Sequence, residues 1–172
     1  ATAGSKQKRD YLQRMGIRFV SDSRSLGFAD EIHAWTHGAG VDVVLNTLSG
    51  EGLQKSLEAL APYGRLVEIG KRDITEDKTL ALAAFDRNLT FSALDLDKMM
   101  VQRPSVFKGL LEEIRGHFQS GTFYSLPTET YPAEKVAEAF RLMAQAKHIG
   151  KIAIDFSQPP PTIRAADKPS AA

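Results

Sequence analysis

Three cationic side chains crowd the start of a predicted helix near the beginning of the chain. Lys6, Lys8 and Arg9 follow Ser5, a residue type that often caps a helix N-terminus. The helix dipole disfavours positive charge in a first turn, so these cations reduce the stability of the helix. A phosphate held by Ser5 and Lys8 would offset that cost. A second interpretation stays open, in which Ser5 only caps the helix and solvent surrounds the cations.

Polar or small residues directly follow three apolar runs of strand length. They are Asn46 and Thr47, Gly70 and Lys71, and Asp95 and Asp97. In open α/β sheets, ligands bind outside the carboxyl ends of the strands, where these residues would gather. A lysine is charged at pH 7, so Lys71 could stabilise or protonate an anion that forms in a reaction. The residues alone slightly favour a solvated loop at 71–73.

Helix and strand patterns alternate along most of the chain. The patterns predict helices over residues 5–15, 28–35, 53–60, 80–85 and 104–118, and strands over 17–20, 41–45, 65–69 and 89–94, with a turn at 62–64. Nearly continuous apolar runs suit parallel strands that are buried on both faces. The sequence therefore predicts a doubly wound α/β sheet.

The pattern changes after Gly121. Residues 122–131 are predicted as extended chain, 132–143 as a helix and 151–156 as a final strand. Residues 157–172 include three consecutive prolines and too little apolar surface for a core, which is typical of a linker or tail. We therefore expect three parts, residues 1–121, 122–156 and 157–172.

The composition argues against several classes of function. The 22 basic and 21 acidic residues give a net charge of +1, so we expect no general attraction to nucleic acid or to a membrane surface. The absence of cysteine fits a cytoplasmic protein and removes thiol catalysis and cysteine-bound zinc from this chain. His33 and His37 lie four residues apart without an obvious third ligand. We interpret them as solvated helix histidines and expect no metal site.

The residues before the first helix bear on the choice of a nucleotide. In a dinucleotide-binding fold, an acid at this place selects NAD, whereas a small residue beside Lys or Arg accepts the 2′-phosphate of NADP. Ala3, Gly4 and Ser5 stand where the acid would be, which favours NADP. The glycine-rich phosphate loop of such folds is missing, because the glycines at 38–40 and 50–52 are at the wrong places and are predicted as turns. We therefore expect the fold to be N-terminally incomplete.

Two longer stretches carry a more specific resemblance. Residues 40–50, GVDVVLNTLSG, and 60–73, LAPYGRLVEIGKRD, resemble the enoyl reductase domains of modular polyketide synthases and animal fatty acid synthases. These domains belong to the medium-chain dehydrogenase/reductase superfamily. Residues 137–143 and 148–152 resemble the closing helix and strand of the family. The resemblance implies a Rossmann-like nucleotide-binding domain, followed by a short returning piece of the substrate domain.

The resemblance also implies an activity. Such domains use NADPH to reduce an α,β-unsaturated acyl thioester on an acyl carrier protein, with hydride going to the β-carbon and a proton to the α-carbon. Lys71 and Asp95 fall where the proposed proton donors of the family lie. The residues that would bind the cofactor are Ser5, Lys8, Arg24, Asn46, Thr47, Gly70 and Lys71.

The family pattern is incomplete in this chain, and alternatives stay open. The substrate domain that comes first in the family is missing, so we expect the 172 residues alone not to turn over substrate. Other domains of the same synthase would be partners, and residues 89–94 could form a homodimer contact or a capped edge. One alternative is a free-standing quinone oxidoreductase or enoyl-CoA reductase of the same superfamily. Another is a non-catalytic domain that binds NADPH or acts as a scaffold.

Overall fold

The computed structural model describes residues 1–157, in two compact units. The first unit is Ala1–Leu111 and the second begins at Glu112. The helices are α1 (Lys6–Arg14), α2 (Phe28–Trp35), α3 (Glu51–Glu58), α4 (Arg72–Thr75), α5 (Leu96–Gln102), α6 (Pro104–Gln119) and α7 (Val136–Ala144), with 3₁₀ turns η1 (Leu82–Arg87) and η2 (Ala133–Lys135). The strands are β1 (Val41–Asn46), β2 (Leu60–Glu68), β3 (Thr90–Ala93), β4 (Thr128–Pro132) and β5 (Lys151–Asp155).

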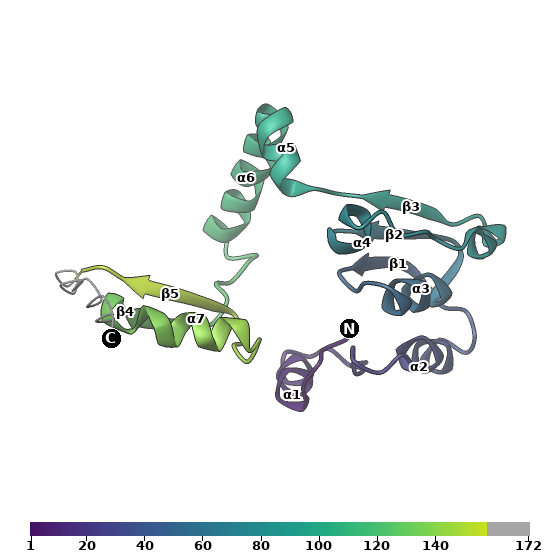
Figure 1. Ribbon diagram of the computed structural model, residues 1–172, viewed down its shortest axis with the longest axis horizontal. Helices are drawn as coiled ribbons and strands as arrows, with labels where there is room; N and C mark the ends of the chain where they lie inside the picture. The colour runs from purple at the N-terminus through teal and green to yellow at the C-terminus, as the bar shows by residue number, and fades with distance from the viewer. Residues whose placement is uncertain (158–172) are drawn as a thin grey trace, which may run out of the picture. The chain divides into compact units, whose positions relative to one another are not determined.

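The first unit is built on a parallel sheet in the order β1-β2-β3 (Figure 1). Helix α3 connects β1 to β2 and packs against both strands. Helices also precede β1 and follow β3, so helix and strand alternate as the sequence predicts. The predicted α/β fold class with parallel strands is confirmed.

The core of the first unit lies between α3 and the sheet. Leu57 of α3 and Leu60 and Leu66 of β2 are fully buried, and Leu53 and Leu89 complete the cluster. Burying a leucine side chain contributes about 1.5–3 kcal/mol to folding. The leucine spacing that predicts a helix over 53–60 therefore marks the face of α3 that packs on the sheet.

Strand β2 begins earlier and less regularly than the sequence predicts. Val41 pairs with Leu60, but Val43 pairs with Arg65, so the intervening residues of β2 bulge from the ladder. Tyr63 has φ of 63°, in the left-handed region. The predicted turn at 62–64 is thus an irregularity inside a strand. The predicted helix through Leu60 was wrong in its last residues, because α3 ends at Glu58.

The predicted strand at 17–20 was wrong. This part of the chain carries only an isolated parallel bridge between Thr2 and Ser21. Ala3 N donates to Ser21 O at 3.0 Å, and Ser21 N donates to Ala1 O at 2.9 Å. Residues 1–3 therefore pair with Ser21, and residues 17–20 form no strand. Two short helices, α4 and α5, were also not predicted, since neither offers a long apolar repeat.

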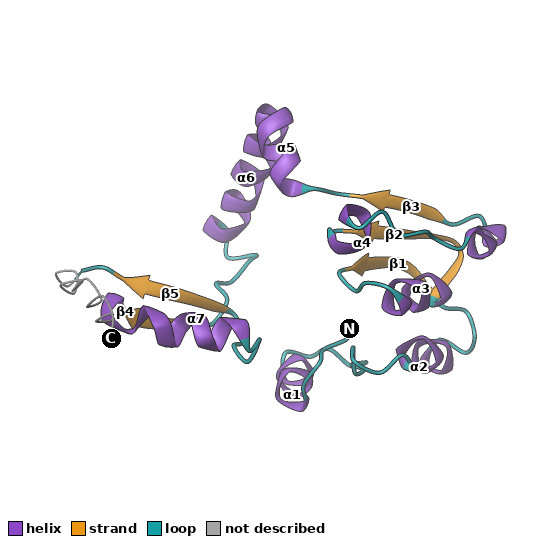
Figure 2. Ribbon diagram, viewed as in Figure 1, coloured by secondary structure: helices purple, strands orange, loops and turns teal. Residues whose placement is uncertain are grey.

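The second unit contains a parallel pair of strands, β4 and β5, with α7 between them in sequence (Figure 2). The predicted helix and final strand of this part are confirmed, whereas the predicted extended chain pairs only from Thr128. The predicted linker at 157–172 lies outside the described residues, apart from Ser157. In residues 1–157, no helix combines the length and apolar character that a membrane span requires.

Candidate functional site

The carboxyl ends of the three parallel strands lie level with one another. Asn46 of β1 pairs with Glu68 of β2, and Glu68 pairs with Ala93 of β3. The loops that follow these residues therefore leave the same edge of the sheet, as the sequence predicts. We call residues 46–49, 68–73 and 93–97 together the carboxyl edge.

Lys71 and two aspartates form an ion cluster at the carboxyl edge. Lys71 Nζ lies 3.0 Å from Asp95 Oδ1 and 2.5 Å from Asp97 Oδ2. Asp97 is 79% exposed and Asp95 only 28%. The structure thus brings Lys71 and Asp95 together, as expected, and adds Asp97. The sequence places Asp97 at this edge but predicts no role for it.

The cluster favours the charged forms of its members. Hydrogen bonds from Lys71 to Asp97 and Asp95 raise the pKa of Lys71 above its ordinary value of 10.5. Asp95 caps α5 by accepting from Lys98 N at 3.1 Å. That backbone hydrogen bond and the contact with Lys71 lower the pKa of Asp95 below its ordinary value of 3.8. Lys71 is therefore positively charged at neutral pH.

Asn46 is buried beside Glu68 and makes its side-chain hydrogen bonds within the protein. It is 2% exposed, and its Nδ2 donates to Glu68 Oε2 at 2.5 Å and to Leu48 O at 2.7 Å. Its Oδ1 accepts from Ser56 Oγ of α3 at 2.8 Å. This arrangement makes Asn46 a support of the carboxyl edge. Nothing in the sequence indicates that Glu68, a charged residue at a strand end, is buried with it.

A cavity of about 290 Å³ opens at the carboxyl edge. Its lining includes Thr47, Gly70 and Lys71, three of the residues that were predicted to lie beside a cofactor. A second cavity of about 550 Å³ has Arg24 in its lining. Both cavities are lined by residues 47–49, so one continuous wall runs from Arg24 towards Lys71.

The start of α1 has a side-chain cap and one cationic side chain without an ion pair in residues 1–157. Ser5 Oγ accepts from Lys8 N at 3.3 Å, so Ser5 does cap the helix. Lys6 pairs with Asp10 at 2.7 Å, and Arg9 pairs with Asp22 at 2.9 Å. Within residues 1–157, Lys8 is the member of this cationic group that makes no ion pair. Of these three cations at the start of α1, Lys8 is therefore the one available to a ligand.

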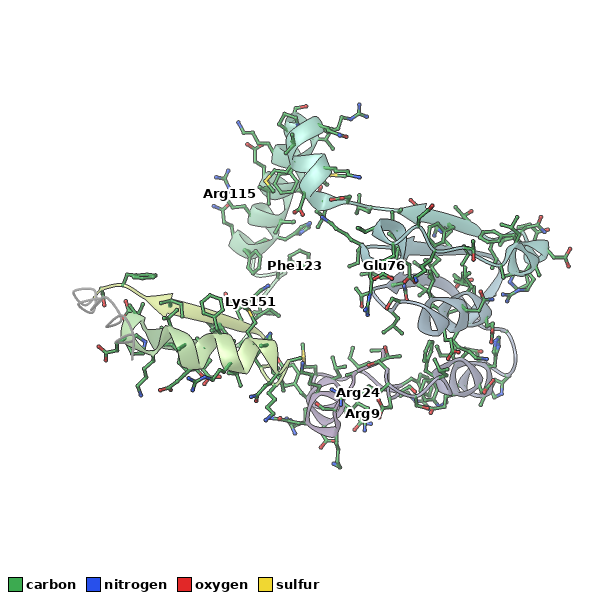
Figure 3. The ribbon with its side chains drawn as sticks, viewed as in Figure 1. Arg9, Arg24, Glu76, Arg115, Phe123 and Lys151 are labelled. Atoms are coloured by element: carbon green, nitrogen blue, oxygen red, sulfur yellow. The ribbon has the colours of Figure 1, made fainter. Side chains whose placement is uncertain are left out.

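Arg24 lies against the start of α1. A Cβ at Gly4 would lie 3.0 Å from Arg24 Nε, so the lack of a side chain at Gly4 gives the guanidinium its place. Arg9 also donates to Ala3 O at 3.0 Å. Figure 3 labels Arg9 and Arg24 beside α1. The exposed guanidinium of Arg24 is thus next to the helix that carries Ser5 and Lys8.

The N-terminus of α3 already holds an anion of the protein itself. Gly50 N donates to Asp73 Oδ2 at 2.6 Å. A carboxylate at this position satisfies one of the unpaired N–H groups that begin a helix. Residues 50–52 were predicted as a turn, and the structure makes them the start of α3, with Gly50 as its N-cap.

His33 in α2 and His37 just after this helix have different environments. His33 is half-buried, and its Nε2 lies 3.0 Å from the carbonyl oxygen of Glu58 at the end of α3. His37 is exposed, with φ of 53°. The interpretation as solvated histidines is therefore wrong for His33, which joins α2 to α3.

Comparisons with known proteins identify similar chains. A family model described as zinc-binding dehydrogenase matches residues 15–154. One polypeptide of the phenolphthiocerol/phthiocerol polyketide synthase of Mycobacterium tuberculosis is 46% identical over 157 residues. The match covers 91% of this chain and 7% of that protein, so this chain spans a small part of its relative.

Solved structures show the same likeness. The nucleotide-binding subdomain of the enoylreductase domain of PpsC from Mycobacterium tuberculosis is 46% identical, with a TM-score of 0.66 over 72% of this chain and 69% of that one. The CurF ER cyclopropanase from the curacin A biosynthetic pathway is 33% identical, with a TM-score of 0.79. That match covers 90% of this chain and 46% of the solved chain.

Proposed function

Because the chain belongs to the zinc-binding dehydrogenase family, in the medium-chain dehydrogenase/reductase superfamily, we propose that it is the nucleotide-binding part of an NADPH-dependent enoyl reductase domain of a polyketide synthase. The substrate is an α,β-unsaturated acyl thioester on an acyl carrier protein. The observation that carries the proposal is the wall at residues 47–49, which is shared by a cavity with Lys71 and a cavity with Arg24. A dinucleotide along this wall has its 2′-phosphate near Arg24 and its reactive end near Lys71.

The phosphate end of the proposed site uses cations and a hydroxyl. Lys8 and Arg24 supply positive charge, and the Ser5 hydroxyl can donate to a phosphate oxygen while its oxygen still caps α1. The residues at this place, Ala3 and Gly4, carry no acid that would repel a phosphate. This arrangement supports the choice of NADPH over NADH.

The reacting end of the proposed site uses the ion cluster. Bound NADPH supplies a hydride for the β-carbon of the enoyl thioester. The ammonium group of Lys71 then stabilises the negative charge on the enolate and donates a proton to its α-carbon. Asp95 favours the charged form of Lys71 and holds it in position through the 3.0 Å contact. The two residues meet because β2 and β3 end at the same edge of the sheet. Thr47 and Gly70 form the wall beside Lys71.

The described residues do not supply the zinc site that the family description names. The chain has no cysteine, and within residues 1–157 no three His, Asp or Glu side chains gather as metal ligands do. His33 makes a hydrogen bond to the Glu58 carbonyl. Among the described residues, the proposed reaction assigns the role of the electrophilic group to Lys71.

Exposed apolar side chains on one face of β1 support the proposal that these residues act only within a longer reductase. Val43 and Leu45, which alternate with Val44, are 51% and 68% exposed. They line a cavity of about 380 Å³ together with Thr2 and Phe19. We propose that residues 1–172 alone reduce no substrate and that other synthase domains are their partners in the cytoplasm. The oligomeric state of the complete protein tests a homodimer contact at residues 89–94.

One experiment tests the proposed activity. The complete protein that contains this chain is supplied with crotonyl thioester, and the oxidation of NADPH and of NADH is followed at equal concentrations. Reduction of the thioester with a clear preference for NADPH is the expected result. Oxidation no faster than without thioester, or equal rates with the two nucleotides, contradicts the proposal.

A further inference from the structure

A carboxylate is buried at the end of β2 without a cationic partner in residues 1–157. Glu68 is 4% exposed. Its Oε2 accepts from Asn46 Nδ2 and its Oε1 accepts from Gly70 N, each at 2.5 Å. Removing a carboxylate from water costs several kcal/mol, which hydrogen bonds offset only where the geometry is good. A residue that carries this cost needs a role that a neutral side chain cannot fill.

The two hydrogen bonds of Glu68 explain why a carboxylate is needed. Both partners are N–H donors, and only a carboxylate presents an acceptor oxygen to each of them. A glutamine would turn an NH₂ group towards either Asn46 or Gly70. A Cβ at Gly70 would lie 2.6 Å from Glu68 Oε1, so the absence of a side chain at Gly70 lets the carboxylate reach the loop.

The hydrogen bonds of Glu68 reach both walls of the Lys71 cavity. On one side, Asn46 joins Glu68 to the Leu48 carbonyl and, through Ser56, to α3. On the other side, the Gly70 N–H ties the loop that carries Lys71. Residues 47–49 and 70–73 line this cavity from these two sides. The hydrogen bonds of Glu68 therefore join the two walls of the cavity.

We propose that Glu68 is a positioning residue, which holds the Gly70–Lys71 loop against the end of β1 so that Lys71 is placed for proton transfer. It acts through Gly70 and Asn46. The catalytic part of this inference rests on the proposed reductase function, whereas the structural part does not. The two parts are measured separately.

The structural part is tested by amide hydrogen exchange in the complete protein. In the Glu68→Ala variant, which leaves the Gly70 N–H without its acceptor, exchange at Gly70 is expected to become at least about tenfold faster, because a hydrogen bond of about 1.4 kcal/mol or more is lost. The amide of Leu94 donates to the backbone oxygen of Glu68 at 2.8 Å and is the internal control, with unchanged exchange. Unchanged exchange at Gly70, or an equal increase at both amides, overturns the inference.

The catalytic part is tested by the steady-state kinetics of the same variant. We expect kcat to fall at least about tenfold while KM for NADPH changes less than about threefold. A native kcat in Glu68→Ala, or a rise in KM for NADPH as large as the fall in kcat, overturns the positioning role.

A second substitution keeps the test decisive if Glu68→Ala does not fold. Gly70→Ala displaces the carboxylate without removing its charge, and Gly109→Ala in α6 is the matched control, since its Cβ meets nothing within 4 Å. Loss of kcat in the first variant alone supports the inference, and native kcat in both overturns it. If the native protein reduces no enoyl thioester, the proposed function fails, while exchange at Gly70 still decides whether Glu68 holds the loop.

Discussion

Lys71 Nζ lies 3.0 Å from Asp95 Oδ1, and this contact joins the end of β2 to the end of β3. The two residues are far apart in sequence, but parallel strands bring their carboxyl ends to one edge. The contact leaves Lys71 48% exposed, so the charged group remains accessible from the cavity beside it.

Loss of the Lys71 charge is expected to slow thioester reduction. In the complete protein, Lys71→Ala lowers kcat at least about tenfold, or about 1.4 kcal/mol of barrier, because the enolate loses its proton donor. Lys78→Ala is the control, since Lys78 is a 59% exposed lysine paired with Glu76. A native rate in the Lys71 variant removes Lys71 from the mechanism.

Asp95→Asn separates charge from helix capping. Asparagine caps a helix about as well as aspartate, so α5 is expected to remain intact. We expect kcat to fall at least about tenfold, since Lys71 loses its less exposed carboxylate partner. Circular dichroism checks the fold, and steady-state kinetics give kcat. A variant that is folded and fully active contradicts the assigned role of Asp95.

The pH dependence of kcat is expected to reveal the two carboxylates. Contact with Asp97 and Asp95 favours protonated Lys71 and raises its pKa, so activity that needs this proton falls only above pH 10.5. Replacing both aspartates with asparagine removes the favourable contacts, and the alkaline fall in kcat moves to lower pH. Rates measured at saturating substrate across the alkaline range check the shift. An alkaline limb at the same pH in native and double variant is the contrary result.

The nucleotide preference is expected to depend on Lys8 and Arg24. Lys8→Ala or Arg24→Ala weakens NADPH binding about tenfold or more, because a charge-assisted hydrogen bond contributes about 1.5–3 kcal/mol. NADH binding changes little in either variant. Lys6→Ala is the matched control on the same helix, because Lys6 is paired with Asp10. Fluorescence titration gives both dissociation constants, and an equal loss for both nucleotides rules out a 2′-phosphate contact.

Gly40 and Gly38 offer a matched pair for stability. Both have positive φ, 81° and 87°, but a Cβ at Gly40 would lie 2.8 Å from Ala59 O, whereas nothing lies within 4 Å at Gly38. Gly38→Ala is expected to lower the free energy of unfolding by about 1–2 kcal/mol, and Gly40→Ala by clearly more. Urea unfolding measures both. Equal losses show that the close approach of Gly40 to the end of α3 contributes nothing.

The part of the site that depends on strand ends could be predicted from the sequence. Apolar runs locate β1, β2 and β3, and the parallel arrangement then places Thr47, Lys71 and Asp95 at one edge. The types of these residues indicate the sign of the charge at each place. Fold class and the gathering of these residues therefore follow from local patterns.

The pairings that depend on distant partners could not be predicted. The bond from Arg9 to Asp22 requires the segment at residues 1–3 to lie beside Ser21. The burial of Glu68 requires two N–H donors that meet only in the folded sheet, the side chain of Asn46 in the neighbouring strand β1 and the backbone of Gly70 in a loop. No local sequence pattern contains either contact, so the environments of Arg9 and Glu68 follow only from the tertiary structure.

Because Arg9 is paired with Asp22, the selectivity of the proposed nucleotide site is expected to depend on ionic strength. In the proposed site, Lys8 and the exposed Arg24 are then the cations that would contact the phosphate. Charges near the surface act over a Debye length of about 8 Å at physiological ionic strength. Discrimination between the two nucleotides is then strongest in dilute buffer and narrows as sodium chloride is added. The ratio of the two dissociation constants is therefore a property of the protein only at a stated ionic strength.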